Sequence, residues 1–170
     1  MERVWQEEVY KVEIEWSNPI SYDDALNVSL EKLEEVYFYK IIGEYSDSYS
    51  LMYIGKVYDQ AVSERLKNKD HQVKRAQWQT EHPRTKFCIS FGQLKSKHFD
   101  EETEKWKRKV VDDIESLLIY SHSDHMKLKN SKSIWSHSIL LEYQVLNTGF
   151  IKEKMIEELA YGLFYKDTRF

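Results

Sequence analysis

The first candidate for a chemical role is a short run at the end of a predicted strand, Tyr53-Ile54-Gly55-Lys56. A helix is predicted soon after this run. The glycine permits a turn there and lets a phosphate group approach the backbone closely. A Tyr-Ile-Gly tripeptide is unspecific on its own, so its meaning depends on the polar residues that accompany it.

Four polar residues downstream accompany this run at suggestive places. Arg65 follows Val62 by three residues on the predicted helix, so it flanks the buried stripe. His71 follows near the end of that helix. Glu115 lies in the middle of a long predicted helix at the edge of its apolar face, and Asn130 follows in a polar loop. An arginine, a helical carboxylate and a phenol are groups that bind and hydrolyse phosphodiesters.

Periodicity and turn residues predict the elements that position these side chains. Strands are expected at 9–16, 36–42, 51–55, 86–91 and 138–146, and helices from 21 onward, at 59–69, from 100 onward and at 151–164. Turns or loops are expected at 43–50, 72–85, 121–133 and 147–149. This order predicts a mixed α/β (α+β) fold, a small mixed or antiparallel central sheet flanked by helices. No repeat or linker interrupts the chain, so residues 1–170 are interpreted as one domain.

Three of the expected helices rest on particular residues. Ser21 begins the first, with Ala25, Leu26, Leu30 and Leu33 as its apolar stripe, and Asp59 is the expected N-cap of the second. The long helix is expected to begin at Asp100-Glu101-Glu102, with an apolar stripe of Trp106, Val110, Ile114, Leu117 and Leu118.

Bulk composition narrows the class of protein. The chain has 170 residues, of which 41% are hydrophobic and 32% charged, as in ordinary globular domains. Its one cysteine, Cys88, excludes an internal disulfide and a cysteine-based zinc or redox motif. No apolar stretch approaches the length of a membrane span, and residues 1–8 are too polar for a secretory signal. The sequence therefore predicts a cytoplasmic protein without a membrane partner.

Charge is distributed unevenly along the chain. Residues 1–36 hold ten acidic residues against three basic ones, a balance of −7. Residues 65–97 hold nine basic residues against two acidic ones, a balance of +7. A basic segment of this kind suits a phosphate-binding face, although it also suits a merely solvated surface. The basic residues predicted to contact nucleic acid are Lys56, Lys67, Lys69, Lys74 and Arg75.

Taken together, the chain resembles the GIY-YIG endonucleases. The likeness rests on a hairpin carrying Glu35-Val36-Tyr37 and Tyr53-Ile54-Gly55, followed by a helical arginine, a helical glutamate and a late asparagine. It covers about residues 34–134, is most specific over 51–71, and leaves extensions at 1–33 and 135–170. The first motif lacks the usual glycine, and Tyr39 is the alternative to Tyr37. The segment between the two motifs also looks long, with 44–50 as the expected insertion.

The resemblance implies a metal-dependent endonuclease that hydrolyses phosphodiester bonds in DNA, or in RNA. The family's functional positions fall on Tyr37, Tyr53, Arg65, His71, Glu115 and Asn130. In this interpretation Glu115 binds Mg²⁺ or Mn²⁺, and Arg65 clamps the phosphate. Tyr37 accepts the proton of the attacking water, and Tyr53 or His71 positions that water.

A tyrosine acts as a base more readily as a phenolate. Positive charge from Lys56, Arg65 and the metal is expected to favour that form. Asn130 is expected to hold the active-site loop or to contact the substrate. His122 and His125 are interpreted as polar residues of a loop.

Two other functions remain open at this level. One is a catalytically inactive relative that binds nucleic acid, and the other is a protein-interaction module that uses the acidic, aromatic N-terminal segment. The protein is expected to be a monomer or a homodimer, with the extensions completing the sheet or forming a contact between subunits.

Overall fold

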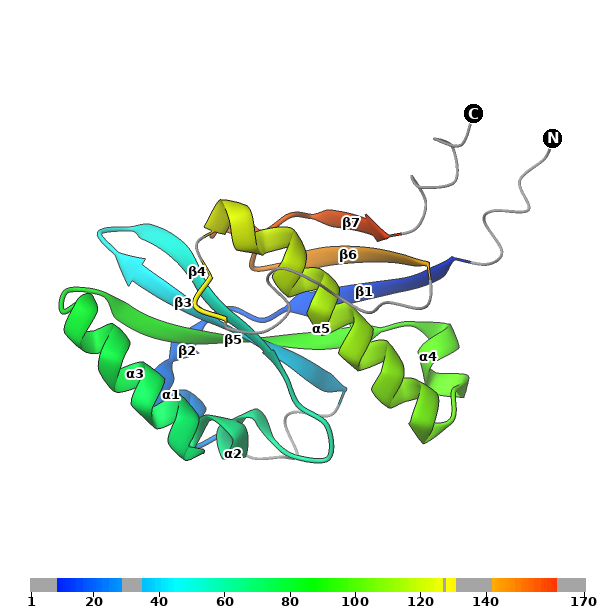
Figure 1. Cartoon of the computed structure of the whole chain (residues 1–170), viewed down its shortest axis with the longest axis horizontal. Helices are drawn as coiled ribbons and strands as arrows, with labels where there is room; N and C mark the ends of the chain where they lie inside the picture. Colours follow the sequence, from blue (N-terminus) through cyan, green and yellow to red (C-terminus); the bar gives the residue numbers. More distant parts are fainter. Residues whose placement is uncertain (1–8, 29–34, 127, 131–141, 162–170) are drawn as a thin grey trace.

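A curled mixed sheet forms the centre of the fold in the computed structural model, which describes residues 9–28, 35–126, 128–130 and 142–161. Six strands follow one another in the order β4-β3-β5-β1-β6-β7, and β2 pairs with β5 beside this path (Figure 1). The strands are β1 Tyr10–Trp16, β2 Ile20–Ser21, β3 Val36–Tyr45, β4 Ser48–Lys56, β5 Lys86–Lys95, β6 Tyr143–Gly149 and β7 Glu158–Tyr161. The helices are α1 Tyr22–Ala25, α2 Val62–Leu66, α3 Lys69–Glu81, α4 Lys97–Glu101 and α5 Glu104–Met126.

This architecture confirms the predicted mixed α+β class. The strands β4, β3 and β5 are antiparallel neighbours from the middle of the chain. Strand β1 comes from the N-terminal extension and β6 and β7 from the C-terminal one, and they continue the same sheet beyond β5. The pair β1 and β6 is parallel, whereas β6 and β7 are antiparallel. The two extensions therefore complete the sheet.

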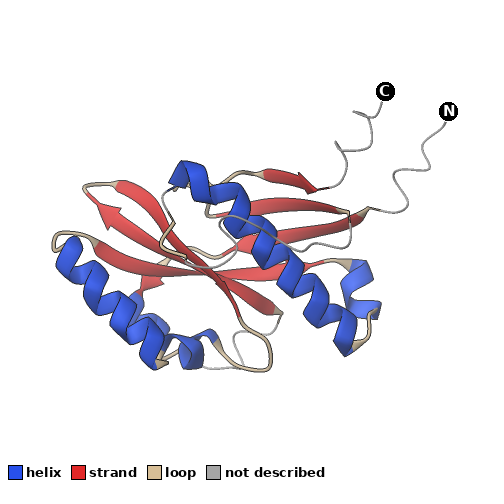
Figure 2. Cartoon of the chain, viewed as in Figure 1, coloured by secondary structure: helices blue, strands red, loops and turns tan. Residues whose placement is uncertain are grey.

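Helices cover the sheet from two sides (Figure 2). One core cluster joins α5 to inward side chains of β1, β4, β5 and β6, including Ile14 and Ile54. A second cluster joins α1, α2 and α3 to side chains such as Tyr39 and Tyr53. Successive residues of a strand point to opposite faces, which is why Ile54 and Tyr53 belong to different clusters. The predicted strands at 9–16, 36–42 and 51–55 are confirmed by this alternation.

The hairpin between β3 and β4 is longer than the sequence indicated. Residues 43–50 were predicted as a polar turn, but only Ser46 and Asp47 connect the strands, both with positive φ angles of 46° and 62°. Two consecutive residues with positive φ form the tight turn that matches the twist of a hairpin. The segment 44–50 is thus extra hairpin length, since cross-strand pairing continues to Tyr45 and Ser48.

Strand β5 continues through Gly92, where the sequence predicted its end. A Cβ atom at Gly92 would lie 2.8 Å from the ring of Trp16 and 3.0 Å from Cβ of Phe38. The glycine is therefore a site of close packing inside the sheet and not a strand terminator.

The region after Tyr53-Ile54-Gly55, called the YIG-like run below, also differs from the prediction. Asp59 was expected as an N-cap, but its φ of 56° is left-handed and α2 begins at Val62 with Ala61 as N-cap. Residues 72–85 were predicted as loop, whereas α3 covers most of them. No glycine or proline interrupts α3, and Trp78 packs its ring against Tyr53 and Phe87. Tertiary packing thus supports a helix that has little amphipathic period of its own.

The long helix is displaced toward the C-terminus relative to its prediction. Residues 97–101 form the separate helix α4, and α5 begins at Glu104 and not at Asp100. Trp106, expected in the apolar stripe, is 45% exposed, whereas Val110, Ile114, Leu117 and Leu118 are buried as predicted. Helix α5 also extends to Met126 through residues predicted as loop, so His122 is a buried helical residue. The side chain of His125 lies outside the described residues.

At the N-terminal side, Ser21 caps α1 as predicted, because its hydroxyl accepts a hydrogen bond from the backbone N–H of Asp24 at 3.0 Å. The helix covers only four residues, with Ala25 buried. Leu26, the C-cap, is partly buried against the second core cluster, and the remaining members of the expected stripe, Leu30 and Leu33, lie outside the described residues.

The C-terminal segment contradicts two predictions. Residues 147–149 were expected as a turn but belong to β6 and pair with β1. Residues 151–164 were expected as a helix, but Glu158–Tyr161 form β7, and residues 162–164 lie outside the described part. Strand β7 pairs with the outer edge of β6 and supplies its backbone hydrogen-bond partners there.

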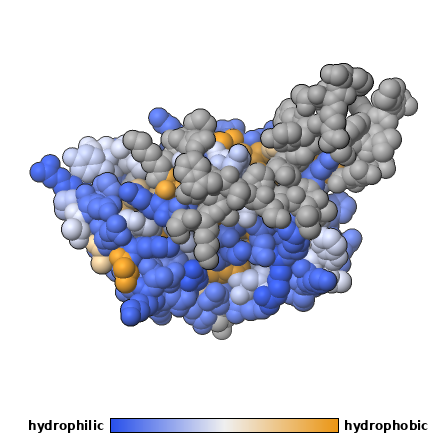
Figure 3. All heavy atoms as spheres, viewed as in Figure 1, coloured by the Kyte–Doolittle hydropathy of each residue, from blue (hydrophilic) through white to orange (hydrophobic). Residues whose placement is uncertain are grey.

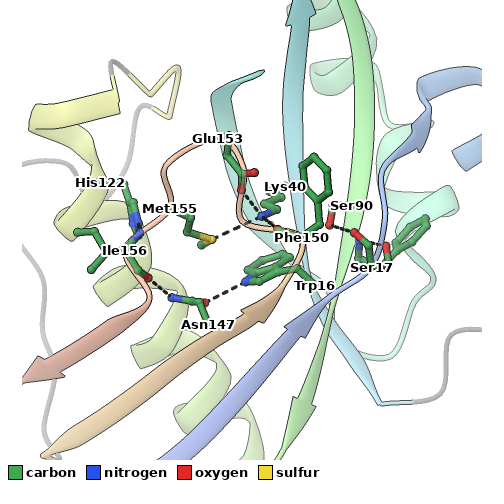
Figure 4. A network of polar contacts seen from close by, with 11 residues as sticks. Trp16, Ser17, Lys40, Ser90, His122, Asn147, Phe150, Glu153, Met155 and Ile156 are labelled. Carbon is green, nitrogen blue, oxygen red and sulfur yellow. Dashed lines mark hydrogen bonds and ion pairs between the residues drawn. The ribbon is translucent and has the colours of Figure 1, made fainter. Parts of the chain in front are cut away.

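A buried polar network ties this segment to the core (Figure 4). The Lys40 ammonium on β3 forms an ion pair with Glu153, and both side chains are 0% exposed. It also donates a hydrogen bond to the backbone oxygen of Phe150 at 2.7 Å and lies 4.6 Å from the ring centroid of Trp16. Burial lowers the pKa of Lys40 to about 8, and the contact with Glu153 opposes that change.

Candidate active site

A cavity of about 600 Å³ opens beside the edge strand β4, bordered by α2 and α3 on one side and α5 on the other. Four of the six residues predicted as functional line it: Tyr53, Arg65, Glu115 and Asn130. Lys56 and Lys74 line it as well. The structure therefore brings together predicted side chains that are up to 77 positions apart in the sequence.

Tyr37 is not part of this cavity, and Tyr39 takes its place. Tyr37 packs its ring against Phe99 and Tyr58, with ring centroids 5.1 Å and 5.6 Å away. In a regular strand, residues two apart point to the same face, so Tyr37 and Tyr39 were expected on one face. A β-bulge between Val36 and Phe38 shifts the register, so Tyr37 joins the α5 cluster and Tyr39 the opposite one.

Tyr39, Tyr53 and His71 form a compact aromatic group. The Tyr39 hydroxyl and His71 Nε2 are hydrogen bonded at 2.8 Å, and the rings of Tyr39 and Tyr53 lie 6.1 Å apart. His71 does not line the cavity but is completely buried behind Tyr39. Gly55 pairs with Tyr39 across the strands, and a Cβ there would lie 2.4 Å from the tyrosine ring. The glycine of the YIG-like run thus makes room for Tyr39.

The ionisation of the two phenols differs from the expectation. Burial raises the pKa of both Tyr39 and Tyr53 above that of a free phenol, and the nearby guanidinium of Arg65 only partly opposes this effect. Positive charge from the protein therefore does not make either tyrosine a phenolate at neutral pH. Each hydroxyl is therefore protonated in the resting protein.

His71 is expected to weaken the fold in acid. Burial lowers its pKa to about 4, with Arg65 adding to the effect and Asp70 opposing it. An unfolded histidine titrates near pH 6.5, so between these values the unfolded state binds a proton that the folded state does not. The free energy of unfolding should therefore fall by about 2 kcal/mol through His71 between about pH 7 and about pH 4.5.

Urea unfolding at the two pH values measures this loss. His71→Gln should lose correspondingly less stability on acidification, while the matched variant His82→Gln, at the exposed end of α3, should behave as the parent protein. Equal acid sensitivity in the parent protein and His71→Gln would contradict the assignment.

Arg65 is held at the mouth of the cavity by a carboxylate. Its two terminal nitrogens contact the two oxygens of Asp70 at 3.3 Å and 3.4 Å. The Arg65 side chain is 27% exposed, and Asp70 is 48% exposed. A guanidinium fork already oriented toward a planar anion in this way can exchange a carboxylate for a phosphate.

Glu115 faces the cavity from α5 with only 19% of its side chain exposed. Burial raises the pKa of its carboxyl, and the Lys56 ammonium 3.1 Å away opposes that change. Asp112, one turn earlier, contacts the same ammonium at 2.5 Å. These side chains supply the hard oxygen ligands that Mg²⁺ or Mn²⁺ prefers.

The metal donor set is small. No cluster of three or more histidine, cysteine, aspartate or glutamate side chains that could hold a metal occurs within the described ranges. Mg²⁺ is commonly bound through one or two carboxylates together with water and substrate phosphate, so Glu115 with Asp112 nearby fits that mode of binding.

Asn130 acts on the backbone of the YIG-like run. Its side-chain amide donates to the backbone oxygen of Ile54 at 2.7 Å and accepts from the backbone N–H of Ile54 at 3.1 Å. The neighbouring Lys129 N–H donates to the backbone oxygen of Met52 at 2.7 Å. This segment therefore pairs with the open edge of β4 and holds the strand that carries Tyr53.

Of the basic residues predicted to contact nucleic acid, some line the cavity and others do not. Lys67 and Lys69 are exposed at the junction of α2 and α3 and do not line the cavity. Arg75 pairs with Asp23 at 2.9 Å and stacks on Tyr22, so it is directed toward α1. The face seen in Figure 3 is mainly hydrophilic along its lower half, where α2, α3 and the start of α5 lie.

Two charged cavity residues on α5 were missed by sequence reasoning. Arg108 stacks on the ring of Tyr58 at 4.2 Å and forms an ion pair with Asp59, and Asp112 holds Lys56. Both lie on the same helical face as Glu115, seven and three residues before it, and this spacing was the signal that would have found them.

None of the helices in the described part of the chain is long and apolar enough to cross a membrane. Compared with models of known protein families, with curated proteins and with solved structures, the chain has no match.

Proposed function

We propose that the protein is a metal-dependent endonuclease that hydrolyses phosphodiester bonds in DNA, with RNA as the alternative substrate. The observation that supports this most is the convergence of Tyr39, Tyr53, Arg65 and Glu115 on one cavity. They come from the β3–β4 hairpin, from α2 and from α5. The cavity thus gathers an arginine, a largely buried carboxylate and two phenols, the groups that binding and hydrolysis of a phosphodiester require.

The protein's own residues divide the work of hydrolysis. Arg65 exchanges Asp70 for the scissile phosphate and holds it by two parallel hydrogen bonds. The oxygen of Tyr39 takes a proton from the attacking water while its own hydroxyl proton passes to Nε2 of His71. This relay needs a neutral histidine, which the low pKa of His71 supplies. It also needs no phenolate in the resting protein.

Glu115 and the neighbouring Asp112 would hold the divalent cation. When bound there, Mg²⁺ or Mn²⁺ stabilises charge on the phosphate and on the leaving oxygen. Asn130 keeps Ile54, and so the strand with Tyr53, in place beside that position.

A catalytically inactive nucleic-acid-binding protein is the second candidate. The contact of Lys56 with both Glu115 and Asp112 favours it, because an ammonium already neutralises the carboxylates that a metal needs. Nicking of a supercoiled plasmid in Mg²⁺ or Mn²⁺, with EDTA as the blank, separates the two functions. Binding of DNA that weakens with salt, without cleavage of any DNA or RNA tried, would favour the inactive binder. Absence of both would contradict both.

Arg65→Lys is expected to lower the nicking rate by roughly tenfold to a hundredfold, because lysine keeps the charge but loses the planar fork. The matched control is Arg84→Lys, which changes an exposed arginine outside the cavity and should leave the rate unchanged. Equal rates for the parent protein and Arg65→Lys would argue against Arg65 as the phosphate clamp.

A further inference from the structure

Lys56 is the cation that faces the candidate metal ligands. Its ammonium lies 3.1 Å from Oε2 of Glu115 and 2.5 Å from Oδ1 of Asp112. It follows Gly55 directly at the end of β4, and its side chain is 34% exposed. The carboxylate that a metal would use is therefore paired with a charge that the protein itself supplies.

The two carboxylates hold Lys56 from one helical face. Asp112 and Glu115 are three residues apart on α5, a spacing that places both side chains on the same side of the helix. Asp112 is 57% exposed and Glu115 only 19% exposed, so the ammonium spans the mouth and the wall of the cavity. A divalent cation on Glu115 would lie beside this fixed positive charge, and like charges at close range repel.

The Lys56 ammonium can also move away from Glu115 and Asp112. Its ammonium is a compact charge on a flexible stem with three rotatable donors, and it is partly in contact with solvent. The same cavity is lined by Arg65 and Lys74, which would draw a phosphate group in. A phosphodiester oxygen is an alternative partner for the ammonium, because it also carries negative charge and accepts charge-assisted hydrogen bonds.

On the basis of the proposed nuclease function, we propose that Lys56 keeps Glu115 closed to divalent metal ions until a phosphodiester draws its ammonium away. Lys56 is then a positioning residue that couples metal binding to substrate binding. The free protein binds Mn²⁺ weakly, and the complex with DNA binds it more tightly. Hydrolytic chemistry is thereby restricted to the moment when a phosphate is in place.

The test measures Mn²⁺ binding to the free protein, from the loss of the electron paramagnetic resonance signal of free Mn²⁺. Lys56→Met is expected to bind Mn²⁺ on the order of tenfold more tightly than the parent protein, because a positive charge that repels Mn²⁺ is removed. Lys56→Gln is the second variant, in case the first does not fold. Adding Glu115→Gln to either variant should abolish the gain.

The matched control is Lys95→Met, which removes a lysine from an exposed ion pair with Glu15 outside the cavity. It changes the net charge equally and should leave Mn²⁺ binding as in the parent protein. Unchanged binding in both Lys56 variants overturns the proposal, as does an equal gain in Lys95→Met.

The coupling to substrate is measured by repeating the titration with a short DNA duplex. Binding of Mn²⁺ by the duplex itself is subtracted using the Glu115→Gln variant. DNA should tighten Mn²⁺ binding more in the parent protein than in Lys56→Met, because the variant gains only the phosphate ligand, and an equal effect in both would overturn the proposal. These readouts do not depend on cleavage, so a protein that never cuts DNA contradicts the nuclease function alone.

Discussion

Replacing Tyr39 by phenylalanine is expected to lower the rate of DNA cleavage by about two to four orders of magnitude, the usual range for loss of a general base. The change removes one oxygen atom and leaves a ring that still packs over Gly55. It breaks the 2.8 Å hydrogen bond to His71 and with it the path for the proton of water. The rate is measured in single-turnover experiments with saturating enzyme, so that weaker binding does not enter.

Tyr37→Phe is the matched control, since it makes the same chemical change two residues away. Tyr37 packs against Tyr58 and Phe99 and does not line the cavity, so its variant should cleave within a few-fold of the parent rate. A larger loss for Tyr37→Phe than for Tyr39→Phe would restore the assignment that the sequence favoured. Similar small losses for both would leave the cleavage step without a tyrosine base.

The largest expected effect on stability belongs to Glu153. Glu153→Gln leaves the Lys40 ammonium completely buried without a countercharge, and breaking a buried pair by removing one partner costs about 3–5 kcal/mol. The rings of Trp16 and Phe150 remain near the ammonium and supply a smaller compensation. The free energy of unfolding is measured by urea denaturation of the purified full chain.

Glu15→Gln provides the comparison, because Glu15 pairs with Lys95 on the surface and both side chains are about half exposed. Solvent screens that pair, so its loss should change stability little. The double variant Lys40→Met with Glu153→Leu should recover most of the lost stability, since it buries no charge. A small effect of Glu153→Gln on the free energy of unfolding would contradict this prediction.

Local sequence patterns determined the main strands, the buried stripe of the long helix and the position of Glu115. Side chains that alternate along a strand or recur along a helix report which face is buried, and this needs no knowledge of a distant partner. Tyr53, Arg65 and Glu115 drew attention because each sits beside an apolar stripe or at the end of an element, and the resemblance to the GIY-YIG endonucleases supplied their expected roles. The mixed fold class followed from the order of these elements.

Features that depend on contacts between residues far apart in the sequence were decided only by the tertiary structure. The choice of Tyr39 over Tyr37 depends on a bulge against β5, and α3 depends on the packing of Trp78. The strand β7, predicted as helix, depends on the free edge of β6. Lys40 and Glu153 are 113 residues apart, and Lys56 and Glu115 are 59 apart.

The Tyr53-Ile54-Gly55 run shows the same division. Its residues predicted a turn and a phenol side chain, but the role of Gly55 is set by the ring of Tyr39 on the neighbouring strand. Its strand is held in place by Asn130, 76 residues downstream of Ile54. Register, bulges and buried ion pairs depend on which surfaces pack together. A local sequence pattern indicates which residues form each surface, but it does not indicate which surface packs against which.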